Sequence, residues 1–216
     1  MTEVKLCGNR SQADYKKSVE SGAPYIGVIF AESKRQVLPE AVNEWIKNHP
    51  PKPHQRIVGV FVNPSIQRIE EVLSLTRLDI LQLHGNETEA TILAIKERFP
   101  LPVWKAIPHH EKAVQQMKLY EGIIDGYVID AKVQGAFGGT GISFDWSHVP
   151  TYINEGKRQG VPCFIAGGVR PENVDELLGY EPFGIDVSSG TETDEQKDTK
   201  KIESIVRRSI HVSHLS

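Results

Sequence analysis

The sequence predicts an α/β fold, a single (β/α)8 TIM barrel with parallel strands over residues 1–216. Short apolar runs rich in β-branched residues alternate with amphipathic stretches of helical spacing, a pattern typical of a parallel sheet covered by helices. The alternation occurs eight times, which suits a closed barrel, although 216 residues is short for this fold. An open, doubly wound sheet is the alternative, but no G-x-G-x-x-G turn follows the first strand.

The predicted strands are apolar runs of the length expected for buried parallel strands. In chain order they are residues 4–7, 25–30, 56–62, 80–84, 102–107, 126–130, 162–166 and 183–187. The predicted helices are residues 11–21, 39–48, 65–75, 87–99, 111–120, 148–158, 171–178 and 199–211. Ser11 opens the first helix with Asp14 three residues on, close to a capping box. No linker divides the chain, and the short acidic run 191–195 is expected to be a solvated loop.

Composition restricts the class of partner. Hydrophobic residues make up 39% and charged residues 25% of the chain, as in ordinary globular proteins, and the net charge is −3. This balance gives no electrostatic basis for binding nucleic acid or an anionic membrane, and no apolar run is long enough to cross a bilayer. The two cysteines, Cys7 and Cys163, have no metal-binding spacing. Together with the lack of a signal peptide, they indicate a protein of the reducing cytoplasm.

Polar residues gather at one parity of several predicted strands, near the carboxyl ends where barrels hold their functional groups. Because the apolar parity must pack against the helices, the polar set is expected to face the barrel interior. It consists of Lys5, Cys7, Gln82, His84, Asp130, Asp186 and Ser188. Any one of these alone would be an ordinary hydrogen-bonded structural group. Their convergence from different strands indicates a site, because an unpaired buried charge is costly.

Glycine-rich turns follow the last three strands. They are Gly138-Gly139-Thr140-Gly141, Gly167-Gly168 and Ser188-Ser189-Gly190. A Gly-Gly pair alone is usually just a tight turn. Three such turns at adjacent strand ends favour a phosphate site, because glycine lets backbone N–H groups approach an anion closely.

Arg35 lies in the loop after the second predicted strand, on the same face of the barrel. A loop arginine is most often solvated. At this position its planar guanidinium would be able to pair bidentately with a substrate carboxylate.

Taken together, these segments resemble the phosphoribosylanthranilate isomerase family from residue 4 to about residue 206. The matching motifs are Lys5-Leu6-Cys7-Gly8, Phe30-Ala31-Glu32-Ser33-Lys34-Arg35, Gln82-Leu83-His84-Gly85, Gly138-Gly139-Thr140-Gly141, Phe144-Asp145-Trp146, Ala166-Gly167-Gly168-Val169 and Asp186-Val187-Ser188-Ser189-Gly190. One departure is Thr191, which stands where the family commonly has valine or isoleucine.

The resemblance implies an enzyme of tryptophan biosynthesis. The family carries out the Amadori rearrangement of N-(5′-phosphoribosyl)anthranilate to 1-(2-carboxyphenylamino)-1-deoxyribulose 5-phosphate, with no cofactor or metal. Carried over to this chain, Asp130 is the general acid, Cys7 the general base and Arg35 the partner of the anthranilate carboxylate. The remaining substrate-binding residues are His84, Asp186, Gly139, Gly141, Gly167, Gly168, Ser188, Ser189 and Gly190. The expected partner is this small phosphosugar, and the family contains both monomers and homodimers.

Cys7 is expected to need a nearby cation, because a free thiol with a pKa of about 8.5 is mostly protonated at neutral pH. Lys5 is a candidate for that cation, though it is equally able to pair with Asp186. Cys163 begins a strand, away from its carboxyl end, and is expected to be a packing residue. Two alternative functions stay open: another phosphosugar barrel enzyme of the epimerase or thiamin-phosphate synthase type, and a catalytically silent phosphate-binding barrel.

Overall fold

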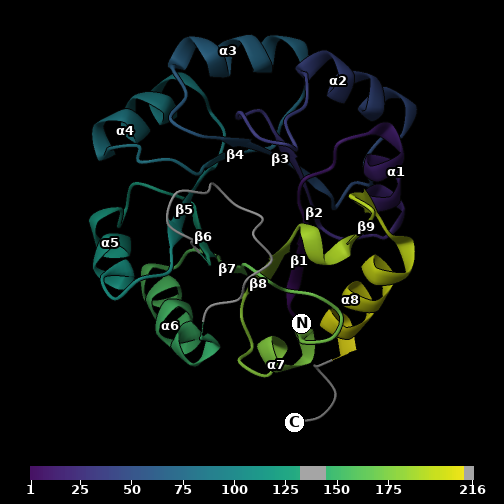
Figure 1. The fold of residues 1–216 in the computed structure, drawn as a ribbon. Coiled ribbons are helices and arrows are strands. Elements are labelled where there is room, and N and C mark those ends of the chain that lie inside the picture. The colour runs from purple at the N-terminus through teal and green to yellow at the C-terminus, as the bar shows by residue number, and fades with distance from the viewer. Residues whose placement is uncertain (132–144, 212–216) are drawn as a thin grey trace.

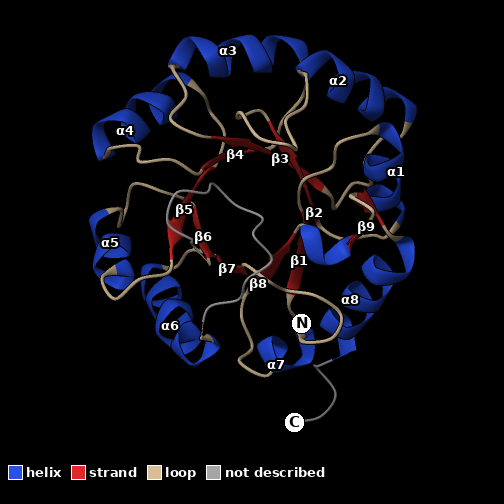
Figure 2. Cartoon of the chain, viewed as in Figure 1, coloured by secondary structure: helices blue, strands red, loops and turns tan. Residues whose placement is uncertain are grey.

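The computed structural model describes residues 1–131 and 145–211, and within them eight parallel strands close into a barrel. The strands form the inner ring and the helices the outer ring (Figures 1 and 2). The strands are β1 (Glu3–Leu6), β2 (Tyr25–Ile29), β3 (Arg56–Phe61), β4 (Ile80–Leu83), β5 (Val103–Pro108), β6 (Gly126–Asp130), β7 (Cys163–Ala166) and β8 (Gly184–Val187). The predicted barrel is therefore confirmed, and the open sheet is excluded.

The helices lie along the outside of the barrel, each after one barrel strand, and the last of them follows the final strand. They are α1 (Gln12–Glu20), α2 (Pro39–Asn48), α3 (Ile66–Leu75), α4 (Glu89–Arg98), α5 (Ala113–Leu119), α6 (Val149–Gln159), α7 (Val174–Leu178) and α8 (Thr199–His211). A short 3-10 turn, η1 (Trp146–His148), precedes α6. A second one, η2 (Ser189–Thr191), follows β8 and leads into a hairpin of β9 (Glu192–Thr193) and β10 (Gln196–Lys197). None of the described helices is both long and apolar enough to cross a membrane.

The ends of the elements follow local hydrogen bonding. Ser11 caps α1 as predicted, because its side chain accepts a hydrogen bond from the N–H of Asp14. Helix α4 begins two residues later than predicted, because Thr88 is its N-cap and accepts from the N–H of Thr91. Glu87, just outside the helix, instead accepts hydrogen bonds from the backbone N–H groups of Asn63 and Gly85.

The barrel closes where β1 pairs with β8, in a register that sets Lys5 beside Asp186. The predicted side-chain parity is confirmed on these strands. Val4 and Leu6 of β1, like Ile185 of β8, belong to the large apolar core between the sheet and the helices. The opposite parity therefore faces the barrel interior.

A smaller apolar cluster fills the amino-terminal half of the barrel interior. The rings of Tyr25, Trp104 and Phe164 pack with centroids 4.8–5.2 Å apart, and Val58 and Val128 lie in the same cluster. Such ring contacts add to the stabilisation that comes from burial. The result is an aromatic floor, so polar groups inside the barrel are confined to its carboxyl-terminal end.

The run 191–195, expected to be a solvated loop, is only partly so. Thr191 is buried and the side chain of Glu192 is 8% exposed, whereas the side chain of Glu195 is 63% exposed. The expectation is wrong for the first two residues because the β9–β10 hairpin folds them onto the barrel mouth, where buried cations meet them.

The floor has no spare volume beside Phe164, which gives a test of its packing. A Cβ at Gly184 would lie 2.3 Å from Cε1 of Phe164. We expect Gly184→Ala to lower the free energy of unfolding by roughly 1–3 kcal/mol, because the added methyl group overpacks the core. In a Phe164→Leu background, which removes the opposing ring, the added loss should be smaller. Urea unfolding of the four proteins measures both values, and equal losses in the two backgrounds would contradict the packing argument.

Candidate active site

A cavity of about 370 Å³ opens at the carboxyl-terminal end of the barrel. Its lining includes Cys7, Arg35, His84, Asp130, Gly167, Gly168, Asp186, Ser188, Ser189 and Gly190, all of them predicted site residues. The two other predicted residues, Gly139 and Gly141, lie outside the described part of the chain. The structure therefore brings together the predicted residues that it describes.

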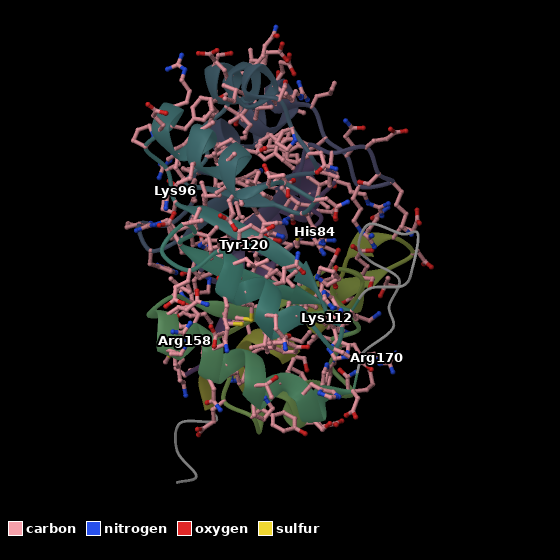
Figure 3. All side chains as sticks on the ribbon, turned by 90° about the vertical axis from the view of Figure 1, so that its left-hand side faces the viewer. His84, Lys96, Lys112, Tyr120, Arg158 and Arg170 are labelled. Carbon is pink, nitrogen blue, oxygen red and sulfur yellow. The ribbon has the colours of Figure 1, made fainter. Side chains whose placement is uncertain are left out.

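The side view of Figure 3 shows which end of the barrel this is. His84, which follows β4, lies toward the same end as Lys112 and Arg170, whereas Lys96 and Arg158 lie toward the other end. Functional groups of (β/α)8 enzymes lie at the carboxyl ends of the strands, and this cavity obeys that rule.

Cys7 directly follows β1, where its backbone N–H donates to the carbonyl of Val187 at 2.8 Å. Its thiol occupies space that the glycine of the neighbouring strand leaves open, because a Cβ at Gly27 would lie 2.6 Å from Cys7 Sγ. Burial raises the pKa of the Cys7 thiol above its ordinary value, and the nearby Lys5 ammonium offsets only part of that rise. The thiol is therefore held in place but is not made acidic by the protein alone.

Lys5 is fully buried, and its Nζ donates to Oδ2 of Asp186 at 2.7 Å. Burial lowers the pKa of Lys5, but the Asp186 and Cys7 charges outweigh this effect and raise it above its ordinary value. Lys5 therefore remains a cation with two partners, paired with Asp186 and acting electrostatically on Cys7. Both roles considered for it from the sequence are compatible with this geometry.

Asp130 ends β6 and approaches the imidazole of His84, with Oδ2 3.3 Å from Nε2. On the other side of the ring, Gln82 Nε2 lies 3.4 Å from His84 Nδ1. This places a carboxyl group, an imidazole and an amide in one row across the barrel mouth. A carboxyl group in such a row is positioned to exchange a proton with a ligand in the cavity.

Three buried polar atoms of the cavity lining have no hydrogen-bond partner among the described residues. They are Gln82 Oε1, Asp186 Oδ1 and Ser188 Oγ. Because leaving such atoms unpaired costs free energy, they favour a ligand with several hydroxyl groups. A sugar has this chemistry.

The loops after β7 and β8 pack closely enough to form a backbone cradle. Gly167 and Gly168 have φ values of 89° and 67°, a conformation that favours glycine. Gly190 lies directly against the β7 loop, since a Cβ there would sit 1.8 Å from the carbonyl oxygen of Val169. A hollow of about 180 Å³ lies between these loops, with Arg170, Glu172 and Lys201 in its wall. Two cations against one carboxylate, beside glycine backbone, suit a phosphate group.

Arg35 reaches the cavity with an intramolecular partner that the sequence did not reveal. Its Nε and Nη2 donate to the two carboxylate oxygens of Glu192 at 3.0 and 2.8 Å. Lys197 lies behind Glu192, with Nζ 3.4 Å from Oε1. Sequence analysis missed Glu192 and Lys197, and the one available signal was their position just after Ser188-Ser189-Gly190.

The second cysteine behaves as predicted. Cys163 is buried in the core between sheet and helices, and burial raises its pKa to about 12. It is therefore a packing residue. No group of three or more His, Cys, Asp or Glu side chains within residues 1–131 and 145–211 is arranged to hold a metal ion.

Comparison with known proteins connects this geometry to one family. The sequence model described as N-(5′-phosphoribosyl)anthranilate (PRA) isomerase matches residues 4–208. The N-(5′-phosphoribosyl)anthranilate isomerase of Geobacillus thermodenitrificans is 51% identical over 205 residues, which cover 95% of this chain and 92% of the relative.

Two solved structures agree. One, of monomers of the dimeric phosphoribosylanthranilate isomerase from Thermotoga maritima, has a TM-score of 0.80 and 32% identity and covers 97% of this chain and 99% of that one. The other is a phosphoribosylanthranilate isomerase in complex with reduced 1-(o-carboxyphenylamino)-1-deoxyribulose 5-phosphate. Its TM-score is 0.80 and its identity 31%, again covering 97% of this chain and 99% of that one. The match favours an isomerase over the epimerase, thiamin-phosphate synthase and silent-barrel alternatives, and the chain belongs to the N-(5′-phosphoribosyl)anthranilate isomerase family.

Proposed function

We propose that this chain catalyses the Amadori rearrangement of N-(5′-phosphoribosyl)anthranilate to 1-(2-carboxyphenylamino)-1-deoxyribulose 5-phosphate, a step of tryptophan biosynthesis. One observation carries the proposal: Cys7 directly follows β1 and Asp130 ends β6, two strands that are not neighbours in the barrel, and both residues line the same cavity. A proton donor and a proton acceptor on separate strands are what an aldose–ketose rearrangement requires.

Asp130 is the general acid of the first step. Its carboxyl group gives a proton to the furanose ring oxygen as the C1′–O bond breaks, and the anthranilate nitrogen lone pair forms the C1′=N bond. Cys7, as the thiolate, then removes the proton from C2′, and the electron pair moves to give an enolamine. Tautomerisation of the enolamine yields the ketone. Asp130 gives one proton to the substrate and Cys7 takes one from it, so the substrate's proton count is unchanged and the overall reaction is redox-neutral.

The binding roles follow the two charged ends of the substrate. Arg35 pairs with the anthranilate carboxylate, since a guanidinium recognises a carboxylate bidentately. The phosphate rests on the backbone of the loops after β6, β7 and β8, including Gly139, Gly141, Gly167, Gly168, Ser189 and Gly190. Between these ends, His84, Asp186 and Ser188 face the sugar, and the unpaired oxygen atoms of Asp186 and Ser188 support that assignment.

The setting of the enzyme is also part of the proposal. The chain acts as a single barrel domain over residues 1–216, in the cytoplasm, as a monomer or a homodimer. The dimeric relative from Thermotoga maritima supports the second of these states. Its partner is a small phosphosugar rather than nucleic acid or a membrane.

The role of Cys7 is tested by Cys7→Ser. We expect kcat to fall by at least about a hundredfold with the fold intact, because a hydroxyl group is a far poorer base than a thiolate. Cys163→Ser is the matched control, a buried cysteine outside the cavity, and should keep near-normal kcat. Turnover assays and circular dichroism on both variants decide the matter. Near-normal turnover of a folded Cys7→Ser protein would remove Cys7 from the mechanism.

The role of Asp130 is tested by Asp130→Asn, which keeps the shape of the side chain but has no acidic proton to donate. Ring opening should be blocked, with kcat reduced by about a hundredfold or more, while the reduced product analogue still binds. Asp194→Asn, on the exposed β9–β10 turn, serves as the control. Turnover by Asp130→Asn above about a tenth of the wild-type rate, less than 1.4 kcal/mol of barrier, would require another acid.

The role of Lys5 is tested by the pH profile. Because the thiolate is the base and burial raises the pKa of Cys7, kcat/KM should rise with pH through the neutral range. Lys5 lowers the pKa of that thiol, so Lys5→Met should move the rising limb to higher pH. The measurement is kcat/KM against pH for both proteins, with circular dichroism as the check on folding. A limb that stays in place or moves to lower pH would contradict the role assigned to Lys5.

A further inference from the structure

The guanidinium of Arg35 is held by one edge only. Arg35 is 6% exposed, and Glu192 occupies its side edge through Nε and Nη2. A guanidinium has five N–H groups, so three remain, and two of these point along the end edge formed by Nη1 and Nη2. No hydrogen bond from that edge is found among the described residues, and Arg35 lines the cavity. The end edge is therefore available to a second carboxylate.

The path of the Arg35 side chain is fixed before a ligand arrives. It crosses Gly8, where a Cβ would lie 2.6 Å from Arg35 Cδ, and Gly8 has a φ of 76°. A long arginine side chain loses considerable rotamer entropy when a ligand orders it. Here the contacts with Glu192 and Gly8 have already removed that freedom, so less affinity is lost on binding.

Glu192 is itself held by a buried lysine. Lys197 is 2% exposed, and its Nζ donates to Ser188 O at 2.9 Å, to Thr191 Oγ1 at 3.0 Å and to Glu192 Oε1 at 3.4 Å. The backbone N–H of Lys197 donates to Oδ1 of Asp14 in α1 at 2.8 Å. The β9–β10 hairpin thus ties the carboxylate of Glu192 both to the outer helix layer and to the loop after β8.

The charges of this group do not cancel. Arg35 and Lys197 are basic residues, and among the described residues Glu192 is the one anion in direct contact with both. Burial raises the pKa of Glu192, but hydrogen bonding to Arg35 and the charge of Lys197 lower it below its ordinary value, so the carboxylate is ionised. Burial lowers the pKa of Lys197, but the neighbouring Glu192 carboxylate favours its charged form, which leaves an excess of positive charge beside the cavity. An anionic ligand group is the natural complement of that charge.

We propose that Glu192, backed by Lys197, is a positioning residue that holds the side edge of Arg35 so that its end edge receives the aromatic carboxylate of the substrate. The inference rests on the proposed function and names the residues that make its carboxylate subsite specific. Through Ser188 O, Lys197 also connects this subsite to the loop assigned to phosphate. Glu192 therefore aligns the two charged ends of the cavity without touching the reacting atoms.

The main variant is Glu192→Gln, which keeps size and one acceptor but removes the charge. Two ligands are titrated: reduced 1-(o-carboxyphenylamino)-1-deoxyribulose 5-phosphate and the same compound without the carboxylate. We expect roughly tenfold weaker binding of the first and less than about twofold change for the second. KM should rise by a similar factor while kcat changes little. Asp194→Asn, on the exposed turn of the same hairpin, is the matched control and should leave both ligands unaffected.

A double-mutant cycle with Arg35→Ala tests whether Glu192 acts through Arg35. In that background, Glu192→Gln should cause no further loss for the carboxylated ligand. If Glu192→Gln fails to fold by circular dichroism, Lys197→Met takes its place in the same titrations, with the same expected selectivity.

Three results would overturn the inference. Tighter binding of the carboxylated ligand by Glu192→Gln would make Glu192 a competitor for Arg35. Equal loss of both ligands would make it a structural residue of the hairpin, and unchanged binding of both would leave Arg35 independent of it. Failure of the proposed function is distinguishable from all three, because the wild-type protein would then neither turn over the substrate nor bind the carboxylated analogue.

Discussion

The ion pair of Lys5 and Asp186 lies at the seam where the first and last strands of the barrel meet, and the active site depends on it. The register of β1 and β8 sets the two residues side by side, and their charged atoms are 2.7 Å apart in a nearly dry interior. A buried pair of this kind adds little net stability, but a single buried charge without its partner would be strongly destabilising. The barrel therefore tolerates Lys5 and Asp186 only together, and the pair places the Lys5 ammonium group next to Cys7.

Desolvation strengthens the binding of a ligand in this cavity but opposes formation of the thiolate base. The aromatic floor of Tyr25, Trp104 and Phe164 confines polar groups to the barrel mouth, which strengthens every electrostatic interaction with a ligand there. The same burial raises the pKa of the Cys7 thiol and works against formation of the thiolate. Lys5 reduces that penalty without removing it. The protein thus combines a dry, shaped cavity with a thiol base, and the surrounding cations must stabilise the thiolate form of that base.

Much of the fold was predictable because strand positions follow from local composition. The run that forms β6, Gly126–Asp130, matches the predicted bounds, since it is a continuous apolar stretch that ends in one polar residue. Helix α4 starts late because Thr88 is its N-cap, and Glu87 before it makes a buried contact with Lys105 of β5, 3.0 Å away. A carboxylate that pairs with a residue of the next strand leaves no local signal in the sequence.

The site residues at the strand ends were also predictable from the sequence. One site residue that the sequence did not reveal was missed for a physical reason. Cys7 and Asp130 were found because the ends of parallel strands meet at one face, whatever the loops do. Glu192 was not found, because an acidic residue in a polar run is usually solvated, and its burial depends on Arg35 from a loop more than 150 positions earlier. Contacts between distant loops are set by three-dimensional packing rather than by periodicity, so they are the part of this site that required the structure.

The hydroxyl group of Thr191 shows how such a contact is maintained. A buried lysine needs an acceptor for each of its three N–H groups, and here Ser188 O, Thr191 Oγ1 and Glu192 Oε1 supply them. Valine at position 191 would leave two acceptors for the three N–H groups, and the Thr191 hydroxyl also donates to Ser188 O at 2.8 Å. Burial lowers the pKa of Lys197, so each acceptor that favours its charged form helps to keep the cation behind Glu192. The Thr191 hydroxyl therefore acts, through Lys197 and Glu192, on the guanidinium of Arg35.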